Sequence, residues 1–141
     1  MGYQIKILSV GRLKEQWLKQ ALDHYIRRMA PSAAIACVWA KNSAQLTSLA
    51  LKEAALIGLD PQGQAMDSEQ FSAFLFQELE THGSRLAFII GDDKGLPKII
   101  KKERPLVSLS FLTFPYQMTR LILLEQLYRA FEIAKNSRYH K

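Results

Sequence analysis

The sequence predicts an α/β fold in which a mostly parallel sheet is covered by helices on both faces. Short apolar runs alternate along the chain with amphipathic runs of helical period, and neither a repeat nor a low-complexity tract separates them. Such alternation is typical of parallel sheets. The 141 residues are 48% hydrophobic and 23% charged, which is ordinary for a globular protein. We therefore expect one domain over residues 1–141 with a buried core.

The first half of the chain contains three predicted strands and two predicted helices. The first strand ends at Gly11, and the spacing of Leu18, Leu22 and Met29 predicts a helix that Pro31 stops. The continuous apolar run that follows predicts a strand covered on both faces of the sheet. The predicted strands span residues 5–10, 33–40 and 55–59, and the predicted helices span residues 14–29 and 43–52.

The second half begins with Asp60-Pro61-Gln62-Gly63, which breaks the third strand. Asp67 or Ser68 is positioned to cap a helix that Gly83 closes. The remaining predicted elements are strands over residues 86–90 and 106–111 and a last helix from 118 to about 135. Ligands of parallel sheets bind beyond the carboxyl ends of the strands. This rule selects three loops, at residues 60–63, 91–95 and 112–117.

Positive charge is concentrated toward the C-terminus. The segment from Lys94 to Lys141 has ten Lys or Arg and three Asp or Glu, whereas residues 1–93 have nine and ten, so one end supplies the net charge of +6. This favours a polyanionic partner, with a solvated basic helix as the alternative. The single cysteine, Cys37, excludes an internal disulfide and is expected to be a buried, inert thiol. Neither a signal peptide nor a membrane span is visible, so we expect a cytoplasmic protein.

Local chemistry leaves alternatives open. The glycines of residues 91–95 allow a ligand to approach the backbone, or simply a tight turn. The apolar loop 112–117 either lines a pocket for a flat group such as adenine or packs under the last helix. Arg120 favours a ligand role, since a cation at a helix N-terminus opposes the dipole, whereas Glu125 and Arg129 have the spacing of a surface ion pair. The histidines lack partners at metal-ligand spacing, so no metal is expected.

A set of short motifs is specific in combination. The motifs are Ile7-Leu8-Ser9-Val10-Gly11-Arg12-Leu13-Lys14, Ile89-Ile90-Gly91, Gly95-Leu96, Leu109-Ser110, Thr113-Phe114-Pro115, Gln117-Met118, Arg120, Glu125-Gln126-Leu127-Tyr128-Arg129-Ala130 and Tyr139-His140-Lys141. Through them the chain resembles the ribosomal RNA large subunit methyltransferase H family, small members of the SPOUT class of methyltransferases. The resemblance implies a C-terminal trefoil knot, which is rare in proteins, and a homodimer. It also implies S-adenosyl-L-methionine as the cofactor and 23S rRNA within the ribosome as the partner, methylated at N3 of pseudouridine 1915 in helix 69.

The resemblance also implies which residues form the site. The cofactor-binding residues that it implies are Leu59, Gly91, Leu109, Ser110, Phe111, Leu112, Thr113 and Phe114. The C-terminal tail is expected to close the site, and the catalytic candidates are Arg120, Arg129, Tyr139, His140 and Lys141. A cation among them stabilises the N3 anion of the substrate, and a neutral His140 accepts the proton.

The chain departs from the family at two positions, with Asp92 in place of a glycine and Tyr116 in place of a histidine. These departures leave a second hypothesis, a knotted RNA- or ribosome-binding protein that has lost catalysis. A third is a nucleotide-binding module of the flavodoxin type, without a knot. Binding of S-adenosyl-L-methionine separates the three hypotheses.

Overall fold

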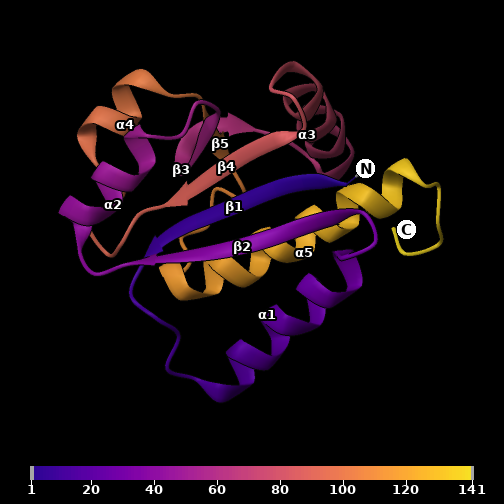
Figure 1. The fold of residues 1–141 in the computed structure, drawn as a ribbon, viewed down its shortest axis with the longest axis horizontal. Coiled ribbons are helices and arrows are strands. Elements are labelled where there is room, and N and C mark those ends of the chain that lie inside the picture. The colour runs from indigo at the N-terminus through magenta and orange to yellow at the C-terminus, as the bar shows by residue number, and fades with distance from the viewer. Residues whose placement is uncertain (1, 141) are drawn as a thin grey trace.

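The computed structural model describes residues 2–140, which form five strands and five helices in strict alternation (Figure 1). In chain order they are β1 (Tyr3–Val10), α1 (Gln16–Met29), β2 (Ala33–Ala40), α2 (Ser43–Leu51), β3 (Leu56–Ala65), α3 (Ser68–Thr81), β4 (Arg85–Ile90), α4 (Lys98–Glu103), β5 (Leu106–Ser108) and α5 (Tyr116–Ala134). The predicted alternation is confirmed, and α4 is the element that the sequence pattern did not predict. No helix among residues 2–140 is long and apolar enough to cross a membrane.

All strand pairings in the sheet are parallel, and the strand order is β2-β1-β4-β3-β5. The carboxyl ends of the strands therefore lie at one edge, at the left of Figure 1; we call this the carboxyl edge. β2 lies at the border of the sheet, beside β1, and its Ala34 and Ala36 are exposed. The prediction that residues 33–40 are covered on both faces is therefore wrong for the first half of the strand, where Ala34 and Ala36 lie exposed on one face; Val38 and Ala40 further along the same face are packed.

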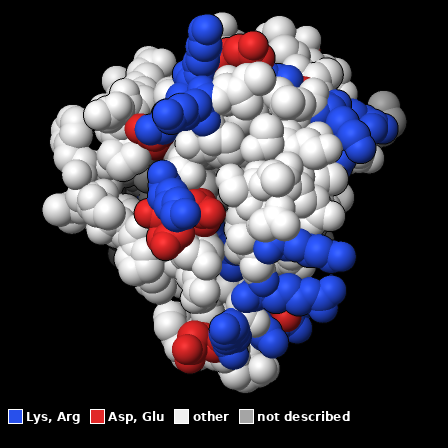
Figure 2. All heavy atoms as spheres, turned by 90° about the vertical axis from the view of Figure 1, so that its left-hand side faces the viewer, with Lys and Arg blue, Asp and Glu red and all other residues white. Residues whose placement is uncertain are grey.

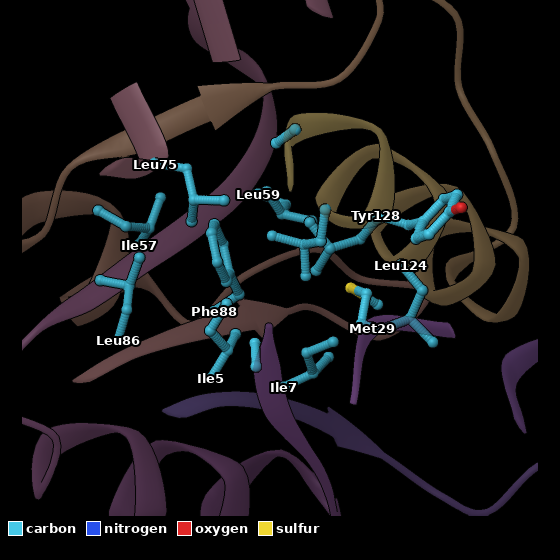
Figure 3. Packing of buried hydrophobic residues seen from close by; sticks show 14 of the residues in the cluster. Ile5, Ile7, Met29, Ile57, Leu59, Leu75, Leu86, Phe88, Leu124 and Tyr128 are labelled. Carbon is cyan, nitrogen blue, oxygen red and sulfur yellow. The ribbon is translucent and has the colours of Figure 1, made fainter. Parts of the chain in front are cut away.

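Strand side chains alternate between two hydrophobic clusters, one on each face of the sheet. Phe88 of β4 lies in the cluster that α1, α3 and α5 cover, and its neighbour Ile89 lies in the cluster that α2 and α4 cover. Figure 1 shows α1 and α5 together on one side of the sheet and α2 and α4 on the other. Figure 3 shows Phe88 among side chains of β1 and β3 and of the covering helices. The prediction of helices on both faces is confirmed.

The break predicted in the third strand is present in a modified form. β3 continues to Ala65, but its ladder with β5 moves from Leu59 directly to Gln64, and both residues pair with Val107. Residues 60–63 therefore bulge out of the regular pairing at the carboxyl edge.

β5 is shorter than predicted, because it ends at Ser108 instead of residue 111. The Ser108 hydroxyl donates to the Ser110 carbonyl at 2.9 Å, and the Leu112 N–H donates to the Ser110 hydroxyl at 2.9 Å. Such local side-chain bonds compete with a strand ladder and turn the chain away from the sheet.

Helix boundaries follow the expected capping chemistry. Asp67 caps α3, since its carboxylate accepts from the Gln70 N–H at 2.7 Å while the Gln70 side chain accepts from the Asp67 N–H at 2.9 Å. α5 begins at Tyr116, earlier than predicted, because Pro115 at its N-cap fixes φ at −54° and directs the chain into the helix.

Two expectations about the fold stay predictions. These are the C-terminal trefoil knot and the assignment of residues 1–141 to a single domain.

Candidate functional site

The three loops selected by the strand-end rule meet in one cavity of about 630 Å³ at the carboxyl edge. The loops follow β3, β4 and β5, and the first turn of α5 completes the wall. The cavity is lined by Leu59, Asp60, Pro61, Ile90, Gly91, Asp92, Asp93, Gly95, Leu96, Leu109, Ser110, Leu112, Thr113, Phe114, Pro115, Tyr116 and Thr119. The three loops that the strand-end rule selects therefore lie together around one cavity.

The loop after β4 needs both of its glycines. A Cβ on Gly91 would collide with the backbone of Gly95 and Leu96, and Gly95 has a left-handed φ of +86°. The Gly95 N–H donates to the Asp92 carbonyl at 2.9 Å, and the Lys94 N–H donates to the Asp92 carboxylate at the same distance. The carboxylate at the position where the family has a second glycine is thus tied into the turn.

The bulge after β3 places a buried carboxylate in the cavity wall. Asp60 is 8% exposed, and one of its carboxylate oxygens accepts from the Gln62 N–H at 2.8 Å. Its other oxygen lies 3.4 Å from Nζ of Lys101 on α4. A Cβ on Gly63 would come within 2.6 Å of the Leu106 backbone, so glycine allows β3 to approach β5 here. The sequence pattern did not predict that α4 would hold this wall.

The loop after β5 contributes most of the predicted cofactor residues. Of the eight such residues, seven line the cavity, and Phe111 does not. Phe111 is 86% exposed, since the turn at Ser110 directs it to solvent. Leu112 is also 71% exposed but does line the cavity, at its open side.

Arg120 lies outside the cavity lining and is 2% exposed. Its Nε donates to the Ser9 hydroxyl at 2.9 Å, and its Nη2 donates to the carbonyls of Gly11, at 2.7 Å, and Val10. Burial lowers the pKa of this guanidinium. The cation therefore binds the end of β1, and it fixes the turn of α5 whose Tyr116 faces the cavity. Arg120 therefore has no place in the cavity lining, and its role as a catalytic candidate stays a prediction.

Three of the other catalytic candidates meet with Glu125 on α5. In this tail cluster (Glu125, Arg129, Tyr139 and His140), one Glu125 oxygen accepts from Arg129 Nη2 and from the Tyr139 hydroxyl, each at 2.7 Å. Arg129 Nη1 lies 3.0 Å from His140 Nδ1, and His140 Nε2 lies 3.6 Å from a Glu69 oxygen. Burial and the bond to Glu125 raise the pKa of the Tyr139 phenol, and the Glu125 bond raises the pKa of Arg129.

The tail cluster and the cavity share no residue. Along α5, Tyr116 and Glu125 are separated by about 14 Å at a rise of 1.5 Å per residue. Within one chain, the described tail therefore does not close the cavity. Lys141 lies outside the described residues. No group of three or more potential metal ligands occurs among residues 2–140.

A family model described as predicted SPOUT methyltransferase matches residues 3–140. The chain therefore belongs to the SPOUT methyltransferases. Two of its relatives, both named Ribosomal RNA large subunit methyltransferase H, come from Protochlamydia amoebophila and Carboxydothermus hydrogenoformans. They are 49% identical over 138 residues and 35% identical over 159 residues, and each alignment covers 98% of this chain and 99% of the relative. Within the SPOUT class the chain is thus a member of that methyltransferase family, and the resemblance seen in its motifs is confirmed.

Solved structures show the same fold at low sequence identity. A probable methylase family protein from Haemophilus influenzae aligns with a TM-score of 0.53 at 9% identity, over 98% of this chain and 70% of that one. A putative methyltransferase from Legionella pneumophila, solved with bound SAM, aligns with a TM-score of 0.52 at 12% identity, over 91% and 66%. These structures support the α/β fold of the SPOUT class.

Proposed function

We propose that this protein is an S-adenosyl-L-methionine-dependent methyltransferase of large-subunit ribosomal RNA, which modifies N3 of a pseudouridine on the ribosome in the cytoplasm. The names of its relatives support the substrate class. The observation that carries the proposal is the convergence of three loops, far apart in the sequence, on one cavity of about 630 Å³. That volume lies within the range of about 300–1,000 Å³ found for small-molecule sites.

The cavity lining fits this cofactor chemically. Leu59, Ile90 and Leu109 offer apolar walls for a flat base, while the carboxylates of Asp60 and Asp93 suit the positive charges of the same molecule. Of the residues that the family implies, those that would hold the cofactor are Leu59, Gly91, Leu109, Ser110, Leu112, Thr113 and Phe114. When bound, S-adenosyl-L-methionine supplies an electrophilic methyl group on a sulfonium.

The protein's own contribution is positioning and charge. Alignment of two reacting atoms supplies several kcal/mol without acid–base chemistry. The N3–H proton must also leave, and Arg129 is a cation that can stabilise the resulting anion. His140 cannot accept that proton in the geometry of the tail cluster. An arginine can only donate hydrogen bonds, so Arg129 donates to the lone pair on Nδ1 of His140. In the neutral His140 ring the hydrogen is then on Nε2, which leaves neither ring nitrogen free to accept a proton. Release of the Arg129 contact would free the Nδ1 lone pair.

We also propose a homodimer in which each tail serves the cavity of the other chain. The distance along α5 supports this, because the tail cluster does not reach the cavity of its own chain. A mixture of two inactive variants tests it. Thr113→Trp fills the cavity and Arg129→Ala removes the tail cation that is proposed to stabilise the anion, so a mixed dimer regains one site with an intact cavity and an intact tail. Methyl transfer in the mixture well above the sum of the separate variants supports exchange of tails, and a simple sum contradicts it.

The test of the function itself is methyl transfer to ribosomes. Ribosomes from cells that lack this protein are incubated with the purified protein and S-adenosyl-L-methionine, and the 23S rRNA is digested and mapped by mass spectrometry. A gain of one methyl group on a pseudouridine of helix 69 is expected. Saturable cofactor binding by calorimetry without any methylation of ribosomes would leave the cofactor assignment standing but overturn the substrate.

A further inference from the structure

Exposed cations surround the carboxyl edge of the sheet. They come from the segments that follow β1, β2 and β4, and from α4, and are Arg12, Lys14, Lys41, Lys94, Lys98 and Lys102. We call these six residues the basic rim. Figure 2 looks onto this edge and shows Lys and Arg side chains in several separate groups, with fewer Asp and Glu side chains between them. Because parallel strands end together, topology gathers charges that lie up to 90 residues apart in the sequence.

The basic rim is not neutralised from within the described chain. None of its six residues has an ion-pair partner within 4.0 Å among residues 2–140, whereas the neighbouring Lys101 is paired with Asp60 at 3.4 Å. The exposed carboxylates on the same segments are Glu15, Asp93 and Glu103. Six unpaired cations against three exposed anions leave this edge positive.

α4 fixes part of the rim beside the cavity. Lys98 and Lys102 are four residues apart and so project from the same side of α4, while Ile100 is fully buried against the sheet. The bond from Lys101 to Asp60 joins this helix to the cavity wall, and Lys94 lies between two residues of the lining. Lys94 thus lies on a loop that lines the cavity, and Lys98 and Lys102 lie on the helix that is bonded to the cavity wall.

We infer that the basic rim is the surface that holds the RNA backbone, with Lys94, Lys98 and Lys102 contacting phosphates beside the nucleotide that enters the cavity. This inference rests on the proposed function and specifies where the RNA lies. Lysines near phosphates release condensed counterions, and such contacts fix the register of the RNA without reading its sequence. The opposite edge also carries exposed cations, which are Arg27, Arg28, Lys52, Arg85 and Arg138, but none of them lies on a loop that lines the cavity. Proximity to the cavity, and not the number of cations, therefore distinguishes the basic rim.

A matched pair of double variants tests the inference. Lys98→Ala/Lys102→Ala removes two cations from the rim, and Lys52→Ala/Arg85→Ala removes two exposed cations from the opposite edge. Binding to large ribosomal subunits from cells lacking this protein is measured by filter binding over a range of KCl concentrations. The rim variant is expected to bind about tenfold more weakly, with a slope of log K against log salt that is shallower by about 1.5. The control variant is expected to stay within about twofold of wild type, with an unchanged slope.

Calorimetry with S-adenosyl-L-methionine reports folding of each variant, since neither pair lines the cavity. Equal loss of affinity and slope in the two variants would overturn the inference, as would a rim variant that binds like wild type. Absence of methyl transfer by the wild-type protein would overturn the proposed function instead, whatever the variants do in the binding assay.

Discussion

Replacement of Arg120 by methionine is expected to destabilise the fold by about 3 kcal/mol. Methionine keeps much of the side-chain length but removes all donors, so the Ser9 hydroxyl and the carbonyls of Val10 and Gly11 lose a charged partner. A hydrogen bond to a charged group contributes about 1.5–3 kcal/mol, which gives roughly 5 kcal/mol for three such bonds. Removing a cation that is costly to bury offsets about 2 kcal/mol of this.

Urea unfolding at 25 °C, followed by circular dichroism, measures this loss. With an m-value of about 2 kcal/mol/M, the midpoint is expected to fall by about 1.5 M. Arg129→Met is the matched control, because it removes the same side chain from the same helix but breaks a partly exposed pair with Glu125 that contributes about 1 kcal/mol or less. Equal losses in the two variants would refute the assignment of Arg120 as the bond between α5 and the end of β1.

Three further predictions concern the cavity, a helix cap and the thiol. Leu109→Ala is expected to weaken binding of S-adenosyl-L-methionine by about tenfold in calorimetry, and Phe111→Ala to leave it within about twofold; equal effects would contradict the lining described here. Asp67→Ala should lower the free energy of unfolding by about 1 kcal/mol, and no change would show that the capping box contributes nothing. Burial raises the pKa of the Cys37 thiol from 9.0 to about 11, so alkylation of the native protein should accelerate only as pH approaches 11, while the unfolded chain reacts near pH 9; coincident profiles would contradict this. Because its pKa is higher in the folded state, the Cys37 thiol favours folding while it is protonated. Its contribution to the free energy of unfolding is therefore present below pH 9 and is lost as pH rises through 11.

The sequence could predict the place of the cavity because the strand-end rule depends only on strand order along the chain and on parallel pairing. The glycines at 91 and 95 and the proline at 115 then mark turns whose backbone demands are local. These features need no knowledge of distant contacts, and the structure confirms them.

Other features depend on contacts that local pattern does not contain. The partners of Arg120 lie more than 100 residues earlier, so its spacing on α5 could not show that it would be buried. β2 is as apolar as a central strand, and only the strand order shows that it lies at the border of the sheet. α4 has a single buried residue, Ile100, and so too little periodicity to be recognised.

The sequence correctly predicts an excess of positive charge in the C-terminal third of the chain. It does not predict which of these cations reach the surface or which other cations lie beside them. The C-terminal third does carry the excess of cations, yet Arg120 and Arg129 are engaged in internal bonds there. Arg12 and Lys41, from the nearly neutral part of the chain, join the basic rim instead. Counting charge along the sequence cannot show this, because the parallel topology decides which loops share an edge.

A crystal structure of the protein with S-adenosyl-L-methionine tests the central claim most directly. Electron density for the adenine is expected between the loops after β3, β4 and β5, in contact with Leu59 and Leu109, with the Asp92 carboxylate still bonded to the Lys94 N–H. An empty cavity at saturating cofactor, or density at another place on the molecule, would contradict it.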